Sequence, residues 1–169
     1  VTDMSYMFNN CDSLSSLPEK SSYNNASFLS YFTTPVSFDF SNFNTSNVIN
    51  MSYLFSNCVN LTKIPDISKW KTNKVKNMQG LFYNCSSLVS LPNINIWNVE
   101  KVTDMSKMFY GCKSLSTLPN LSEWTPNHVT DISNMFNNCK NITSIPDISE
   151  WNTNNVKSKI GRASCRERV

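Results

Sequence analysis

Apolar residues return along this chain at a fixed spacing. Five valines stand 27 residues apart, and the same order of residue types follows the first four of them. Met or Ile, Met or Leu, Phe and Cys come three, six, seven and ten residues after the valine, with polar residues between them. Self-similarity at such a period indicates an array whose units bury their apolar sides against one another. The valines are Val48, Val75, Val102, Val129 and Val156.

The start of the chain fits this pattern after one interruption. Val1, Phe8 and Cys11 occupy the first positions of a repeat, and 20 extra residues, 19–38, separate its two halves. We therefore expect one repeat domain over residues 1–159, with repeats that begin at residues 1, 48, 75, 102 and 129. The aromatic-rich insert is either a binding protrusion or, as we favour, a segment that packs on the array or covers its end.

Within each repeat the spacing predicts a short helix followed by a short strand. The apolar positions 0, 3, 6, 7 and 10 lie on one face of a helix. Asp or Asn two residues after the valine is placed to cap the start of this helix, and Asn or Gly nine residues after it marks the end. A Leu-x-x-Leu segment closed by proline predicts the strand. The expected fold is an α/β repeat solenoid of about five coils, each with one helix and one strand of a parallel sheet.

The repeats also resemble a known family. The segment VTDMSKMFYGCKSLSTLPNLSEW, residues 102–124, and its siblings resemble the BspA-type leucine-rich-repeat surface proteins of bacteria and some protists. The resemblance covers residues 1–159 apart from the insert, although Pro followed by Asp or Asn departs from many relatives. It implies a leucine-rich-repeat solenoid in a cell-surface or secreted protein that binds host or matrix proteins in adhesion. The family has no known catalytic residues, so the resemblance implies none here.

The charge of the chain is small once its last ten residues are set apart. Residues 160–169, IGRASCRERV, follow no repeat and resemble the translation of a sequencing-library adapter, so we treat them as a non-native tail. They hold three of the fifteen basic residues and one of the twelve acidic ones. The near-neutral remainder gives no electrostatic basis for binding nucleic acid. With no run of 18 apolar residues and no signal-peptide pattern, we expect a piece of a longer protein that does not itself insert into a membrane.

Five cysteines form one column of the repeat. Their 27-residue spacing is not that of a metal motif, which needs close pairs, and the single histidine, His128, lies in no column. A nucleophile needs an adjacent base, and side chains that point in parallel suit a disulfide poorly. We expect buried structural thiols, with disulfides as the alternative, and neither an enzyme nor a bound cofactor or metal. The column consists of Cys11, Cys58, Cys85, Cys112 and Cys139.

Polar residues around the Leu-x-x-Leu segment are the candidate recognition face. They are small and carry little charge, so this face either binds a protein by shape and hydrogen bonding or is solvated filler. The tryptophan column is a second candidate, but its apolar neighbours favour packing at the edge of the core over stacking on a ligand. The candidate face consists of Thr62, Lys63, Asp66, Val89, Ser90, Asn93, Ser116, Thr117, Asn120, Thr143, Ser144 and Asp147.

These patterns together predict a protein-binding module with a protein as its ligand. The alternatives are an intracellular recognition scaffold and a passive spacer that holds another domain away from a surface. Because no polar cap is recognisable at either end, we also expect self-association through the end coils.

Overall fold

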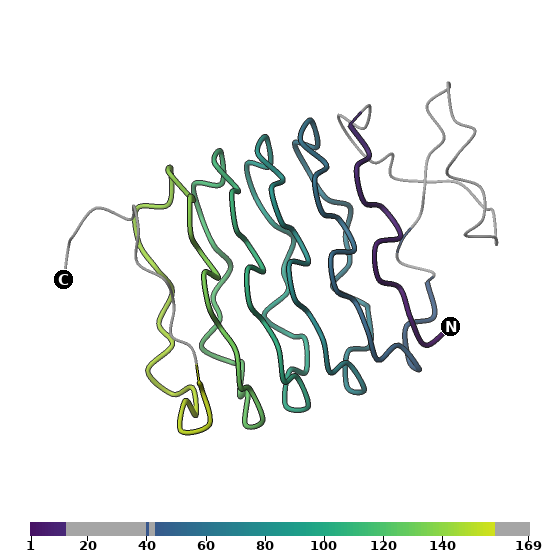
Figure 1. Cartoon of the computed structure of the whole chain (residues 1–169), viewed down its shortest axis with the longest axis vertical. Coiled ribbons are helices and arrows are strands. Elements are labelled where there is room, and N and C mark those ends of the chain that lie inside the picture. Colours follow the sequence, from purple (N-terminus) through teal and green to yellow (C-terminus); the bar gives the residue numbers. More distant parts are fainter. Residues whose placement is uncertain (13–39, 41–42, 158–169) are drawn as a thin grey trace.

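A computed structural model describes residues 1–12, 40 and 43–157 of the chain (Figure 1). Successive repeats form coils that lie side by side in chain order (Figure 1), and backbone hydrogen bonds join each coil to the next. We number these coils 1 to 5, beginning at residues 1, 48, 75, 102 and 129. The insert 19–38 and the tail 160–169 lie outside the described residues.

Hydrogen bonds between neighbouring coils run along the first ten residues of each repeat. N–H groups three, five, seven and nine residues after the valine donate to carbonyl groups two, four, six and eight residues after the next valine. The same four bonds recur between every two consecutive coils. Between coils 3 and 4 they run from Met78 to Asp104 (2.9 Å), Gly80 to Ser106 (2.8 Å), Phe82 to Met108 (2.9 Å) and Asn84 to Tyr110 (2.6 Å).

The predicted short helix is wrong: the described part of the chain contains no α-helix. In an α-helix each N–H bonds to the carbonyl four residues earlier, whereas the N–H of Phe82 bonds to Met108 in the next coil. The segment folds instead as overlapping β-turns, and Gly80 and Asn84 have positive φ values of 57° and 56°. Phenylalanine rings of neighbouring coils lie 5.3 to 5.7 Å apart. A helix about 10 Å wide does not fit a coil at that spacing.

The predicted strand and parallel sheet are wrong as well. The Leu-x-x-Leu segments contribute one isolated parallel bridge, between Lys63 and Ser90. The other four bridges lie two residues after the valine, in the segment predicted to be helical. Nowhere in the described ranges do consecutive bridges form a strand. The α/β assignment is therefore replaced by a stack of coils built from turns and joined by isolated bridges.

The core is formed by the repeated apolar columns. In coil 3, Val75, Met78, Leu81, Phe82 and Cys85 are all completely buried. These are the positions that the spacing assigns to one apolar face, so the prediction of which side chains face inward is confirmed although the element is different. Burial of a continuous core therefore requires the stacking of coils, because one coil covers the apolar side of the next.

Asp and Asn side chains shape the corners of each coil. The Oδ1 atom of Asp104 accepts the backbone N–H of Ser106 over 2.8 Å, and equivalent bonds form at Asp3, Asn50, Asn77 and Asp131. This is the bond expected of a helix cap, but here it closes an Asx turn that leads into no helix. Two further corners use the same device, for example at Asp66 and Asn98.

Candidate binding surface

All twelve residues of the candidate recognition face, which we call the polar face, are exposed. They lie at the same three positions of coils 2 to 5, namely 14, 15 and 18 residues after the valine. Because the coils stack in register, each position repeats across the face once per coil. Val89, 48% exposed, is the only large apolar side chain among the twelve. The surface thus offers small polar groups in rows, on a backbone held by hydrogen bonds between coils.

One row of the polar face also stabilises the fold. The Oδ1 atoms of Asp66, Asn93, Asn120 and Asp147 each accept the backbone N–H of the residue two positions later, over 2.9 to 3.3 Å. Hydrogen bonds from Ser68 lower the pKa of Asp66, and those from Ser149 lower the pKa of Asp147. Both carboxylates are therefore charged at neutral pH, and one oxygen of each is already engaged in a turn.

The cysteine column lies inside the stack. Cys58, Cys85, Cys112 and Cys139 are buried, Cys11 is half-buried, and all five thiols are free. Each of the four buried thiols donates to the carbonyl oxygen of a phenylalanine in the preceding coil, over 2.9 to 3.1 Å. These bonds place the sulfurs at equivalent positions of successive coils.

Cys58 and Cys112 are poor nucleophiles in this environment. Burial, followed by the charge of Cys139, raises the pKa of Cys112 well above its usual value. The pKa of Cys58 is raised to about 12, because a hydrogen bond from Cys11 that lowers it is outweighed by a hydrogen bond with Cys85 and by burial. The thiolate is the reactive form of cysteine, and at neutral pH it is scarce at both Cys58 and Cys112.

The tryptophan column is buried, and its rings stack in two pairs. Trp70 and Trp97 stack with centroids 6.3 Å apart, and Trp124 and Trp151 stack at 6.1 Å. Each indole Nε1 donates to a backbone carbonyl of the preceding coil, as from Trp97 to Ile67 over 3.1 Å. All four rings are at most 5% exposed, so these residues hold coils together rather than stack on a base or sugar.

A strip of tyrosines on the surface is absent from the sequence-based candidates. Tyr6 stacks on Tyr53 (5.2 Å between centroids), Tyr53 meets Tyr83 edge-on (5.9 Å), and Tyr83 stacks on Tyr110 (5.0 Å). These tyrosines occupy two different positions of the repeat, five and eight residues after the valine, so they form no column in the sequence. Gly80 interrupts the first of these positions, and the Tyr53 ring lies over it.

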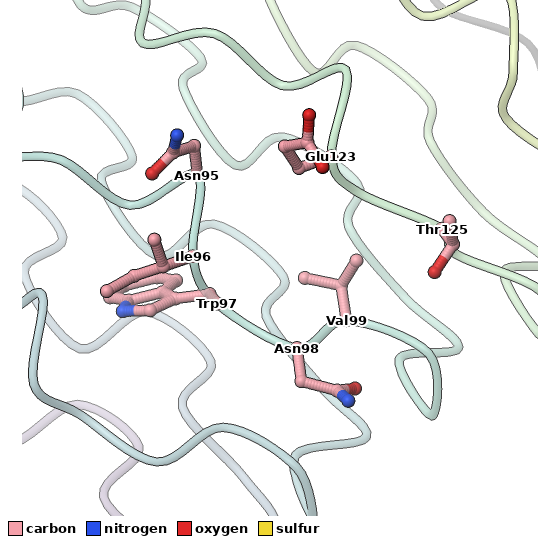
Figure 2. Close-up of a pocket in the computed structure, with 7 residues that line it drawn as sticks. All are labelled: Asn95, Ile96, Trp97, Asn98, Val99, Glu123 and Thr125. Atoms are coloured by element: carbon pink, nitrogen blue, oxygen red, sulfur yellow. The ribbon is translucent and has the colours of Figure 1, made fainter.

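Two hollows lie at the corner where each coil returns. One, of about 300 Å³, is lined by Asn95, Ile96, Trp97, Asn98, Val99, Glu123 and Thr125 (Figure 2). The other, of about 500 Å³, lies one coil earlier and is lined by Ser68, Lys69, Trp70, Lys71, Thr72, Asn73, Ile96 and Asn98. The side chain of Ile96 therefore separates the two. Sequence reasoning missed this corner because its residues differ from repeat to repeat.

Metal-binding clusters and membrane-spanning helices are both absent from the described residues. These residues contain no group of three or more His, Cys, Asp and Glu side chains that could hold a metal ion. His128 is exposed and contacts the backbone oxygen of Glu100 over 2.8 Å. No helix with the length and apolar character needed to cross a bilayer occurs in the same ranges.

Coils of 27 residues that bury one another, and that display equivalent side chains in rows, define a repeat protein. The chain belongs to the family described as "Mycoplasma protein of unknown function, DUF285", which matches residues 2–117 and 89–161. A leucine-rich repeat protein from Eubacterium ventriosum ATCC 27560 is similar at 18% identity with a TM-score of 0.30. That comparison covers 73% of this chain, which spans 44% of the length of the other. No curated protein matches the chain.

Proposed function

We propose that the chain is a protein-binding repeat module of the BspA type, and that the polar face is where it binds. The supporting observation is that all twelve residues of this face are exposed and recur once per coil. Rows of hydroxyl and amide groups suit recognition of an extended protein segment through hydrogen bonds. Only Lys63, Asp66 and Asp147 carry charge there, so specificity would come from shape and hydrogen bonding more than from charge.

A cell-surface or secreted location, with adhesion to host or matrix proteins as the use, is part of the same proposal. It draws on the resemblance of the repeat to BspA-type surface proteins. The alternative uses are an intracellular recognition scaffold and a passive spacer. A catalytic role is not proposed, because the cysteines described above are buried and donate to backbone carbonyls rather than facing a base.

The proposal is tested by measuring binding of the chain to a panel of purified extracellular-matrix proteins by biolayer interferometry. The variant Thr117→Arg with Thr143→Arg places two bulky cations on the polar face. The matched control, Thr2→Arg with Thr153→Arg, changes two exposed threonines elsewhere. We expect the face variant to weaken binding at least about tenfold, and the control to leave it within about twofold.

Two results would count against this assignment. Equal binding by the face variant and the control would place the interaction elsewhere on the molecule. Binding of no matrix protein by the chain, while a neighbouring domain of a longer protein does bind, would favour the spacer.

A further inference from the structure

The corner between the two hollows carries an apolar residue between opposite charges. Lys69, Ile96 and Glu123 stand at the same position of coils 2, 3 and 4, each 21 residues after the valine, and each lies in a turn. All three are exposed, and Ile96 is 62% exposed. Single exposed apolar residues are common on protein surfaces. Here, however, the isoleucine stands on an exposed turn with a lysine one coil before it and a glutamate one coil after it.

The two hollows differ in charge. The hollow between coils 2 and 3 is bordered by Lys69 and Lys71, and the hollow between coils 3 and 4 is bordered by Glu123. Figure 2 shows Ile96 and Glu123 on opposite sides of the hollow between coils 3 and 4. Within the part of the chain that the structure describes, neither Lys69 nor Glu123 forms an ion pair. Glu150, exposed one coil further on, extends the acidic side.

A second copy of this chain that runs in the opposite direction presents negative, apolar and positive residues in turn. That order is complementary in charge to the positive, apolar and negative residues of the first copy. A two-fold axis through Ile96 brings Ile96 against its own counterpart in a second copy. The same axis sets Lys69 opposite Glu123 of that copy, and Glu123 opposite its Lys69. An interface of this isologous kind uses the same patch on both molecules. A parallel arrangement would instead oppose lysine to lysine and glutamate to glutamate, which is unfavourable.

We propose that the corner formed by Lys69, Ile96 and Glu123 is an antiparallel dimerisation surface for a second copy of this chain. Each Ile96 packs against the other between the flanking hollows, and two Lys69–Glu123 pairs set the register. A contact made by three coils lies at the small end of specific interfaces, so the dimer is expected to be weak and to form at micromolar or higher concentration. Thr117 and Thr143 of the polar face line neither hollow.

The symmetry gives a charge-reversal test, made by sedimentation velocity over a range of protein concentrations. Lys69→Glu and Glu123→Lys each oppose like charges at both symmetric contacts, so each should raise the dimer dissociation constant about tenfold or more. The double variant restores opposite charges at both contacts and should recover most of the wild-type affinity. Ile96→Asp should abolish the dimer, because it places two carboxylates at the centre.

Matched controls separate this effect from a change in net charge. Lys113→Glu and Glu100→Lys reverse exposed charges that line neither hollow, and they should leave the dissociation constant unchanged. Because all five substituted residues are exposed, equal thermal midpoints by circular dichroism will show that every variant folds. The variant of the polar face, Thr117→Arg with Thr143→Arg, should dimerise like wild type, so this proposal and the proposed function fail independently.

Three outcomes would overturn the proposal. The chain could remain a monomer at several hundred micromolar. The double variant could be as weak as the single ones, which would mean that the two charges do not meet across the interface. Association could continue beyond two copies and ignore the charge reversals, which is the behaviour of end-to-end stacking, because head-to-tail contacts do not close.

Discussion

The Cys112 thiol donates a hydrogen bond to the carbonyl oxygen of Phe82, one coil earlier in the chain, over 3.1 Å. That carbonyl also accepts the backbone N–H of Cys85, in its own coil, over 3.3 Å. The tryptophans repeat this arrangement, since Trp124 Nε1 donates to the carbonyl of Ile94 over 3.0 Å. The cysteine and tryptophan columns thus add side-chain hydrogen bonds to the backbone hydrogen bonds between coils. The Cys112 and Trp124 side chains each donate to a carbonyl oxygen that accepts one backbone N–H within its turn and can accept a second donor.

Replacement of the Cys112 side chain should therefore destabilise the stack through lost packing and a lost hydrogen bond. We expect Cys112→Ala to lower the free energy of unfolding by about 1–3 kcal/mol. Cys112→Ser keeps a donor near the Phe82 carbonyl and should cost less than the alanine variant. Urea denaturation followed by circular dichroism measures both. A serine variant that is less stable than the alanine variant would show that the thiol acts as apolar filling and not as a donor.

Cys11 supplies the control for this comparison. It is half-buried, and its thiol donates to the carbonyl of Asn9 in its own coil over 3.9 Å, a longer contact than the 3.1 Å bond of Cys112. Cys11→Ala should therefore cost less than Cys112→Ala. Equal costs would mean that burial within the stack does not determine the contribution of a cysteine.

The buried thiols should also react slowly in the folded chain. Burial raises the pKa of Cys112, so its reactive thiolate is scarce at neutral pH, and the stacked coils exclude the reagent. In a Cys165→Ser background, which removes the cysteine of the tail, labelling with Ellman's reagent at pH 7.5 should give one faster thiol, Cys11, and four slow ones. The slow phase should accelerate at least about a hundredfold in denaturant, where opening is complete. Fast labelling of all five in the native state would place the column in water.

The contrast between the helical prediction and the observed turns has a physical cause. A spacing of 0, 3, 7 and 10 places side chains on one side of either a helix or a chain of turns. The choice depends on where the N–H groups bond, and Phe82 bonds to a neighbouring coil that one repeat alone does not reveal. Positive φ recurs five residues after the valine, but Tyr53, Gly80, Lys107 and Asn134 share that position, so no residue type marks it.

The same reasoning explains which parts of the candidate surfaces were predictable. The polar face follows from columns, because every repeat places a similar small residue at the same point. The corner at Ile96 depends on differences between repeats, since Lys69 and Glu123 occupy the equivalent positions. Alignment of the repeats reveals the positions at which they share a residue type. It does not reveal a site formed by residues that differ from one coil to the next. Those residues emerge only when neighbouring coils are placed side by side.

Both the backbone conformation and the tyrosine strip disfavour a side chain at Gly80. Its φ of 57° is disfavoured for a side chain, and an added Cβ would lie far inside contact distance of the Tyr53 ring. We expect Gly80→Ala to lower the free energy of unfolding by about 2 kcal/mol or more, from the left-handed backbone together with displacement of the ring. Gly111→Ala is the comparison variant. Gly111 has a φ of 73°, and an added Cβ there would lie 3.2 Å from its nearest neighbour, Asn84 Oδ1.

A double-mutant cycle separates the two causes at Gly80. In a Tyr53→Ala background the ring is absent, so the cost of Gly80→Ala should fall to about 1–2 kcal/mol, the cost of the left-handed backbone alone. Thermal and urea unfolding of the four chains of the cycle give the coupling energy. A coupling of zero would mean that the ring moves aside freely and that the tyrosine strip is not held in place at this point.

The Asx turns predict how stability changes with acid. Hydrogen bonds from Ser68, with a smaller contribution from the charge of Lys69, lower the pKa of Asp66 in the folded chain. A carboxyl group whose folded pKa is lowered stabilises the fold above its unfolded pKa of about 3.9, and this contribution disappears as the pH falls through the folded pKa. The thermal midpoint should therefore decrease as the pH is lowered below about 4.

Asp66→Asn keeps an Oδ1 acceptor, as Asn93 does in the next coil. The turn should therefore persist in this variant, while the contribution of Asp66 to the pH dependence of stability is lost. Asn93→Asp should add a share of the same sign, because the new carboxylate would accept the same N–H. If both variants gave the wild-type slope, the hydrogen bonds at this corner would not distinguish the charged carboxylate from the neutral acid.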